Sequence, residues 1–313
     1  MLLRHSLGLA IRALLAVGLL SVVLLAVVFT MGALPTALIL EVLGGSGMPT
    51  TTELNRAVLV GTAIALVIAG PGVVWTLVRG VRRERRALLV DSRPATSENG
   101  EGAISAACRR LSARFDVPEP SVRIRSIATP LAYTTYRPED PLFSIRGGNP
   151  TVVVSEGLLA ALSPAERDAV LAHELAHLAN GDLDITAGLL VPVYAAAELY
   201  EGQDSPGFDP VGRAFAATAA IGFGVFSRGR ELAADRAAAT ATGDPAALAT
   251  ALERLDDTNG RTRPTADFRD HIAATDAVNV IPIESDSVAG RLGATHPSTA
   301  TRVERLRRLV AAE

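Results

Sequence analysis

The chain has 313 residues, enough for about two ordinary domains, and 49% of them are hydrophobic. All 30 basic residues are arginine, and with 33 acidic residues the net charge is −3, which gives no indication of nucleic acid as a partner. Cys108 is the single cysteine, which excludes an intrachain disulfide. No histidine partner is indicated near it, so we expect a buried or idle thiol and not a nucleophile.

Two uncharged stretches near the N-terminus, residues 13–34 and 57–78, are long enough to cross a bilayer, which takes about 20 apolar residues. Pro71 would kink the second stretch, and membrane helices tolerate such a kink. A cleaved signal peptide is the alternative for the first stretch, but its apolar core is normally shorter and no small-residue cleavage site follows promptly. We therefore expect residues 1–90 to be an uncleaved anchor with two transmembrane helices.

The distribution of arginine predicts the orientation of this anchor. Several arginines directly follow the second stretch and two precede the first, whereas the loop between them carries only Arg56 beside Glu41 and Glu53. The positive-inside rule then places both flanks, both chain termini and the following domain in the cytoplasm. A patch for lipid headgroups or nucleic acid is the alternative interpretation of the cluster. The clustered residues are Arg79, Arg82, Arg83, Arg85 and Arg86.

Residues 91–102 are polar and rich in turn formers, so we expect a linker there and a second domain over residues 103–313. Its pattern predicts a helix at residues 104–115 and strands at 121–127 and 151–155. The second strand is either an edge strand that binds an extended substrate by β-addition or a plain core strand. The expected fold is mainly α-helical with a small β-sheet.

Two later apolar stretches, residues 185–199 and 211–226, have about 15 residues each, which is below comfortable spanning length. They fit a buried hairpin or a re-entrant membrane segment equally well, and residues 201–210 between them form a turn or loop.

Residues 173–177 read His-Glu-Leu-Ala-His, the HExxH pattern of zinc proteases, within a segment that predicts a helix. Ser163-Pro164-Ala165-Glu166 is a capping box with proline at the first helical position, and Asn180-Gly181 is a stop signal. On this helix His173 and His177 share one face and can bind one zinc ion together. Glu174 can then act as the general base on a water molecule.

A catalytic zinc site needs a third protein ligand. Residues 178–182 contain no histidine, which excludes the three-histidine arrangement of the metzincins. Residues 227–235 predict a helix on which Glu231 and Asp235 share one face. Glu231 is the leading candidate for the third ligand, and Asp235 can accept the ring N–H of a ligating histidine.

Three segments resemble, in order and spacing, the HtpX-like family of membrane zinc metalloproteases. They are residues 173–182 (HELAHLANGD), residues 227–235 (SRxxExxAD) and residues 295–298 (THPS) followed by Arg302. The resemblance implies a gluzincin-type protease domain at the cytoplasmic face of the cell membrane, with one zinc ion per chain. It also implies polypeptide substrates among membrane or misfolded proteins, and it makes the two shorter apolar stretches further spans of a multi-pass protein.

The resemblance assigns a role to each matching residue: His173, His177 and Glu231 match the metal ligands, Glu174 the catalytic base, Asp235 the acid beside a ligand, and His296 and Arg302 a pair lining the site near the substrate carbonyl. From the residues alone, the His296-Pro297 turn is as well explained by a structural cap. The chain departs from the family at Pro130-Leu131-Ala132-Tyr133, where relatives commonly carry Pro-Asn-Ala-Phe. A prenyl-protein (CAAX-type) protease and a non-catalytic membrane metal-binding regulator are the alternative functions.

Overall fold

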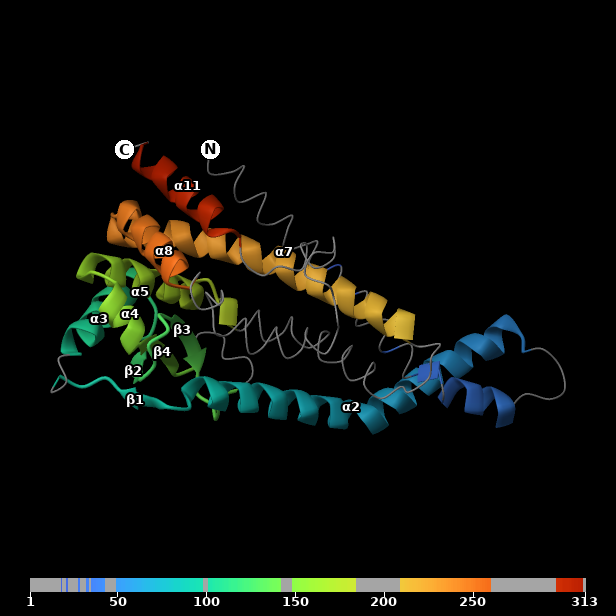
Figure 1. The fold of residues 1–313 in the computed structure, drawn as a ribbon. Helices are drawn as coiled ribbons and strands as arrows, with labels where there is room; N and C mark the ends of the chain where they lie inside the picture. Colours follow the sequence, from blue (N-terminus) through green and yellow to red (C-terminus); the bar gives the residue numbers. More distant parts are fainter. Residues whose placement is uncertain are drawn as a thin grey trace.

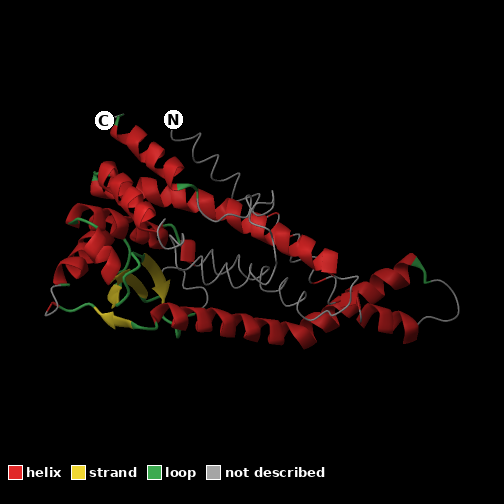
Figure 2. Ribbon diagram, viewed as in Figure 1, coloured by secondary structure: helices red, strands yellow, loops and turns green. Residues whose placement is uncertain are grey.

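The computed structural model describes residues 35–42, 49–97, 101–141, 148–183, 209–259 and 297–311, with a few isolated positions between 18 and 33. The described fold is mainly helical with one small sheet, as predicted (Figure 2). The sheet and several packed helices form one end of the molecule. Two long helices, α2 (Thr51–Leu89) and α7 (Asp209–Thr242), extend from that end in the same direction (Figure 1).

Helix α2 contains the stretch that the sequence predicts to cross a membrane. It begins with a capping box in which the side chains of Thr50 and Glu53 bond each other's backbone N–H. It continues past Pro71 and through the arginine cluster to Leu89, so the proline does not end the helix. Arginine is a good helix former, which suits this last part of α2. Thr51–Ile68 is apolar enough to span a bilayer, and only 17% of it is buried, so these side chains face outward. It is the one such window among the described residues, and the first predicted stretch falls almost entirely outside them.

The sheet has four strands in the order β1-β2-β4-β3. Strand β4 (Pro150–Ser155) pairs in parallel with β2 (Ser121–Arg125) and antiparallel with β3 (Ala132–Tyr136). All six residues of β4 are buried, as expected of a β-branched run covered on both faces. The predicted strand at residues 151–155 is therefore confirmed as a core strand, and its assignment as an edge strand is wrong. Within the described residues, β3 is the edge beside β4.

Strand β1 (Ser92–Pro94) lies in the segment that the composition predicts to be a linker. It pairs antiparallel with β2, and Ala95 N–H donates to the carbonyl of Val122. A short edge strand needs only backbone hydrogen bonds, and proline is tolerated there, so a polar composition did not reveal it. This part of the linker prediction is corrected: β1 starts three residues after α2 ends. The division of the chain into an anchor and a protease domain stays a prediction.

The remaining helices enclose the core with α5 at its centre. They are α3 (Gly102–Phe115), α4 (Glu156–Ala161), α5 (Pro164–Ala179), α8 (Pro245–Asn259) and α11 (Thr299–Val310). Helix α5 packs against α3, α7, α8 and strand β3. The main core joins apolar side chains of α3, α5, α8 and α11, including Leu111, Leu171, Leu248 and Leu306. This packing holds α5 and α7 side by side.

The predicted hairpin at residues 185–226 is described only in part. Residues 184–208 lie outside the described residues, and residues 211–226 belong to α7. Helix α7 runs on without a break into the segment 227–235, because no proline separates the two stretches. One continuous helix therefore replaces the two separate elements that the sequence predicted after residue 210.

Candidate active site

Helix α5 begins and ends where its sequence signals predict. The hydroxyl of Ser163 accepts the N–H of Glu166, and the Glu166 carboxylate accepts the N–H of Ser163 at 2.7 Å. The helix ends at Ala179, and Gly181 follows with a φ of +71°, a conformation that favours glycine. These boundaries place the whole HExxH motif inside regular helix. His173 and His177 consequently lie on the same face.

The two histidines and Glu231 of α7 converge on one point. The Nε2 atoms of His173 and His177 lie 3.2 Å apart. The carboxylate oxygens of Glu231 lie 3.4 Å from Nε2 of His173 and 3.3 Å from Nε2 of His177. All three side chains are buried. Ligands at about 2.1 Å from a tetrahedral zinc ion are about 3.4 Å from one another, so the spacing and the donor set fit zinc.

A carboxylate faces the other ring nitrogen of each histidine. Nδ1 of His177 lies 2.7 Å from Asp182, in hydrogen-bond geometry. Nδ1 of His173 lies 3.0 Å from Asp235, close enough for charge attraction although the N–H does not point straight at the oxygen. Such contacts keep Nε2 aimed at a metal. Asp182 was not assigned a role from the sequence, although its place just after the Asn180-Gly181 stop signal was the available clue.

Arg302 of α11 joins this group of buried charges. Its Nε and Nη2 donate to the two oxygens of Asp235 at 2.8 and 2.6 Å, and its Nη1 lies 3.5 Å from Glu231. Arg302 thus connects Glu231, the candidate metal ligand, with Asp235, the acid beside His173. His296, the other residue of the C-terminal pair, lies outside the described residues.

The carboxylates of Asp235 and Glu231 favour positive charge at His173. Burial lowers the pKa of His173, but contacts with Asp235 and Glu231 outweigh it and raise the pKa to about 9. Burial raises the pKa of Asp235, but Arg302 and His173 outweigh it and lower the pKa to about 2. A site that stabilises a protonated imidazole in this way is electrostatically suited to a divalent cation.

Glu174 is buried beside the two histidines, on the side of α5 that faces β3. The hydroxyl of Thr134, from β3, donates to Oε2 of Glu174 at 3.1 Å. The structure therefore brings together six of the seven site residues that the sequence predicted, Arg302 through its contacts with Asp235 and Glu231, and adds Asp182 and Thr134. The seventh, His296, is outside the described residues.

Comparison with known proteins identifies the same region as a protease domain. The model described as "Peptidase family M48" matches residues 101–310. A "Protease HtpX homolog 1" of Streptomyces coelicolor is 38% identical over 216 residues, which cover 64% of this chain and 68% of the relative. A "Protease HtpX homolog" of Moorella thermoacetica is 32% identical over 223 residues, covering 66% and 71%.

Longer coverage comes from a "Protease HtpX homolog" of a Nostoc species, 31% identical over 271 residues that cover 80% of this chain and 89% of the relative. The crystal structure of Ste24p from S. mikatae is similar at 16% identity with a TM-score of 0.42, over 82% of this chain and 66% of that one. The family match and the identities agree with the geometry of the site. The chain therefore belongs to peptidase family M48, as an HtpX-like metalloprotease.

Proposed function

We propose that this protein is a membrane-anchored zinc endopeptidase that cleaves membrane or misfolded proteins at the cytoplasmic face of the cell membrane. The observation that carries the proposal is the convergence of His173, His177 and Glu231 at the spacing of zinc ligands, with Glu174 beside them. Binding of metal alone does not require Glu174, so its presence favours catalysis over a purely structural or regulatory site.

Each residue of the group has a distinct role in hydrolysis. His173, His177 and Glu231 would hold one zinc ion per chain. When bound, zinc supplies a Lewis acid that polarises the scissile carbonyl and acidifies water. Glu174 accepts the proton of the attacking water and delivers it to the leaving amine.

The outer charges keep the ligands in place. Asp182 and Asp235 orient the imidazoles of His177 and His173 through their Nδ1 atoms. We place Arg302 with this supporting group, because its guanidinium contacts Asp235 and Glu231. A contact of His296 with the substrate carbonyl rests on the family resemblance alone.

Strand β3 is the element that suits an extended substrate. It is the edge beside β4 within the described residues, and it packs against α5, the helix that carries the HExxH motif. A polypeptide that added to this edge would bond through its backbone and present its peptide groups next to α5. Recognition through the backbone fits a protease that accepts many unfolded sequences.

The exposed side chains of α2 support a membrane interface at the catalytic end of that helix. Four arginines spaced i, i+3, i+4 and i+7 lie exposed on one face. Trp75, which is 59% exposed, precedes them, and the guanidinium of Arg79 lies 5.1 Å from the centre of its ring. Tryptophan beside arginine is typical of the cytoplasmic border of a bilayer, which favours a cytoplasmic position for the end of α2 that adjoins the sheet. The arginines of this face are Arg79, Arg82, Arg83 and Arg86.

The proposal is tested with detergent-solubilised protein, by measuring zinc content and cleavage of labelled casein. We expect Glu174→Gln to retain zinc and to lose cleavage, because only the proton acceptor is removed. Glu231→Ala is expected to lose zinc. Glu304→Gln, which changes an exposed glutamate of α11, is the matched control and should behave as wild type. Cleavage by purified Glu174→Gln protein would rule out the mechanism. Unchanged zinc content in Glu231→Ala would show that Glu231 is not a zinc ligand.

The same assays separate the alternatives. A prenyl-protein protease would cleave a prenylated peptide and leave casein intact, whereas a metal-binding regulator would bind zinc and cleave neither. The relatives named as HtpX proteases favour a protease over a metal-binding regulator.

A further inference from the structure

We infer that Thr134 is a positioning residue for the catalytic base Glu174, an inference that rests on the proposed function above. The Thr134 side chain is fully buried, and its hydroxyl donates to Oε2 of Glu174 at 3.1 Å. The same hydroxyl lies 3.4 Å from the main-chain carbonyl of Glu174, which is the weaker acceptor because it is uncharged and farther away. The hydroxyl therefore acts on the carboxylate.

The hydroxyl of Thr134 is held in a fixed place by its surroundings. Threonine is β-branched, so its side chain has few rotamers, and Thr134 lies in the middle of β3, opposite Val152 of β4. Its neighbour Tyr133 donates its hydroxyl to the carbonyl of Leu88 in α2. The hydroxyl of Thr134 is thus mounted on a strand that is tied to both the sheet and the anchor helix.

A fixed donor matters because it favours one orientation of the Glu174 carboxylate. A glutamate has three rotatable bonds, and a general base must stay within hydrogen-bond reach of the proton it removes. Misplacing a catalytic group by about 1 Å can cost about 100-fold in rate. Because Thr134 lies on a different element from the metal ligands, it orients the base without touching the zinc site.

The test compares Thr134→Val, which keeps the size but removes the hydroxyl, with Thr134→Ser, which keeps the hydroxyl. We expect Thr134→Val to lower kcat on labelled casein about tenfold, the effect of losing a modest hydrogen bond to a charged group. KM, zinc content and the zinc affinity of the metal-free protein should not change. Thr134→Ser should recover kcat to within about threefold of wild type, since the donor is retained.

Ser112→Ala is the control. Ser112 is a buried residue of α3, and its hydroxyl donates to the carbonyl of Cys108 at 2.8 Å instead of to the site. This change removes a buried hydroxyl without altering β3 or the contact to Glu174. We expect wild-type kcat from Ser112→Ala.

Several results would overturn the inference. Wild-type kcat in Thr134→Val would do so. So would a serine variant as slow as the valine variant, or an equal loss of kcat in Ser112→Ala. If valine at this position prevents folding, Thr134→Ala replaces it in the same comparison. An inactive wild type would remove the proposed function and the inference together, whereas an active wild type with an unaffected Thr134→Val removes the inference alone.

Discussion

The buried charges beside the metal ligands stabilise one another as a set. Asp235 and Arg302 are both less than a tenth exposed and form a two-point ion pair. Removing one partner of such a pair leaves an uncompensated charge out of water. We expect Asp235→Ala to cost about 3–5 kcal/mol in the free energy of unfolding. Zinc affinity should fall about 10–100-fold, because His173 loses its orienting contact.

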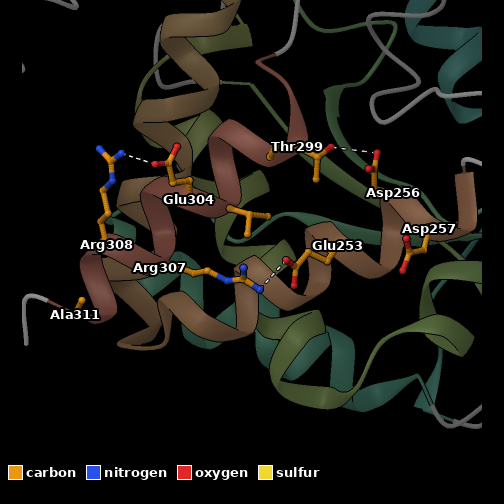
Figure 3. Close-up of a pocket in the computed structure, with 10 residues that line it drawn as sticks. Glu253, Asp256, Asp257, Thr299, Glu304, Arg307, Arg308 and Ala311 are labelled. Carbon is orange, nitrogen blue, oxygen red and sulfur yellow. Dashed lines mark hydrogen bonds and ion pairs between the residues drawn. The ribbon is translucent and has the colours of Figure 1, made fainter.

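Urea unfolding of the metal-free protein measures the first effect and competition with a chelating dye the second. The control is Glu253→Ala on the surface between α8 and α11, where the Glu253 carboxylate lies 2.7 Å from Arg307 (Figure 3). Both side chains are well exposed there, so the loss should stay below about 1 kcal/mol. An equal loss of unfolding free energy in Asp235→Ala and Glu253→Ala would contradict the larger cost expected for the buried pair.

Cys108 gives a pH-dependent reporter of folding. Burial, with smaller contributions from Asp168 and Glu119, raises the pKa of its thiol to about 12. The thiolate reacts with iodoacetamide, so the folded protein should resist labelling up to about pH 10, whereas the unfolded chain should label near its ordinary pKa of about 8.5. Because the folded pKa is the higher one, this group's contribution to stability is complete below the unfolded pKa and is lost as the pH rises towards 12. Rapid labelling of folded protein at pH 8 would show that the thiol is accessible.

The residues of the site differ in how far the sequence could predict them. The histidines and Glu231 follow from helical spacing and from the coordination that zinc requires. The sequence did not predict the roles of Asp182 and Thr134. The contact of Asp182 depends on the turn after α5, and that of Thr134 depends on a strand from another part of the chain. Arg302 was assigned to the substrate carbonyl, whereas in the structure its guanidinium contacts the carboxylates of Asp235 and Glu231. The spacing of residues along one helix does not show which side chains of a second, packed element point towards it.

Among the secondary-structure elements, α4 is held closely against a loop. A Cβ built on Gly157 would lie 2.0 Å from the carbonyl oxygen of Ala128, which is backbone and cannot rotate away. We expect Gly157→Ala to destabilise the protein by about 3 kcal/mol through overpacking. Gly80 in α2 has nothing within 4 Å of the corresponding position, so Gly80→Ala should stabilise its helix by about 0.5–1 kcal/mol. Thermal unfolding of both variants measures the contrast, and a neutral Gly157→Ala would contradict the close approach.

The elements that the sequence predicted are those with strong local signals. Helix α5 has a capping box and a glycine stop, and β4 is a β-branched run between turn formers. Strands β1 and β3 were not predicted, because one is short and polar and the other, Ala132–Tyr136, has no apolar alternation. Their pairing partners are distant in sequence, so tertiary contacts and not local preference determine them.

For the whole molecule, the arginine distribution predicts which side of the membrane each part occupies. The single native cysteine is buried, so an introduced cysteine can be labelled selectively. In intact cells a membrane-impermeant maleimide should label Ser46→Cys, between the two N-terminal apolar stretches of the sequence, and should not label Ala300→Cys, which is exposed on α11. After cell lysis both should react. Labelling of Ala300→Cys in intact cells would place the protease domain outside the cytoplasm.

The short connection between α2 and β1 determines how the protease meets its substrates. Only two residues separate the end of the anchor helix from a strand of the sheet, and Arg85 near that end donates to the carbonyls of Asp140 and Pro141. On the proposed topology, a catalytic domain attached in this way would have no slack tether and would hold its cleavage site at a constant height above the bilayer. We would then expect the depth at which an unfolded segment emerges from the membrane to decide, before its sequence does, whether that segment is cut.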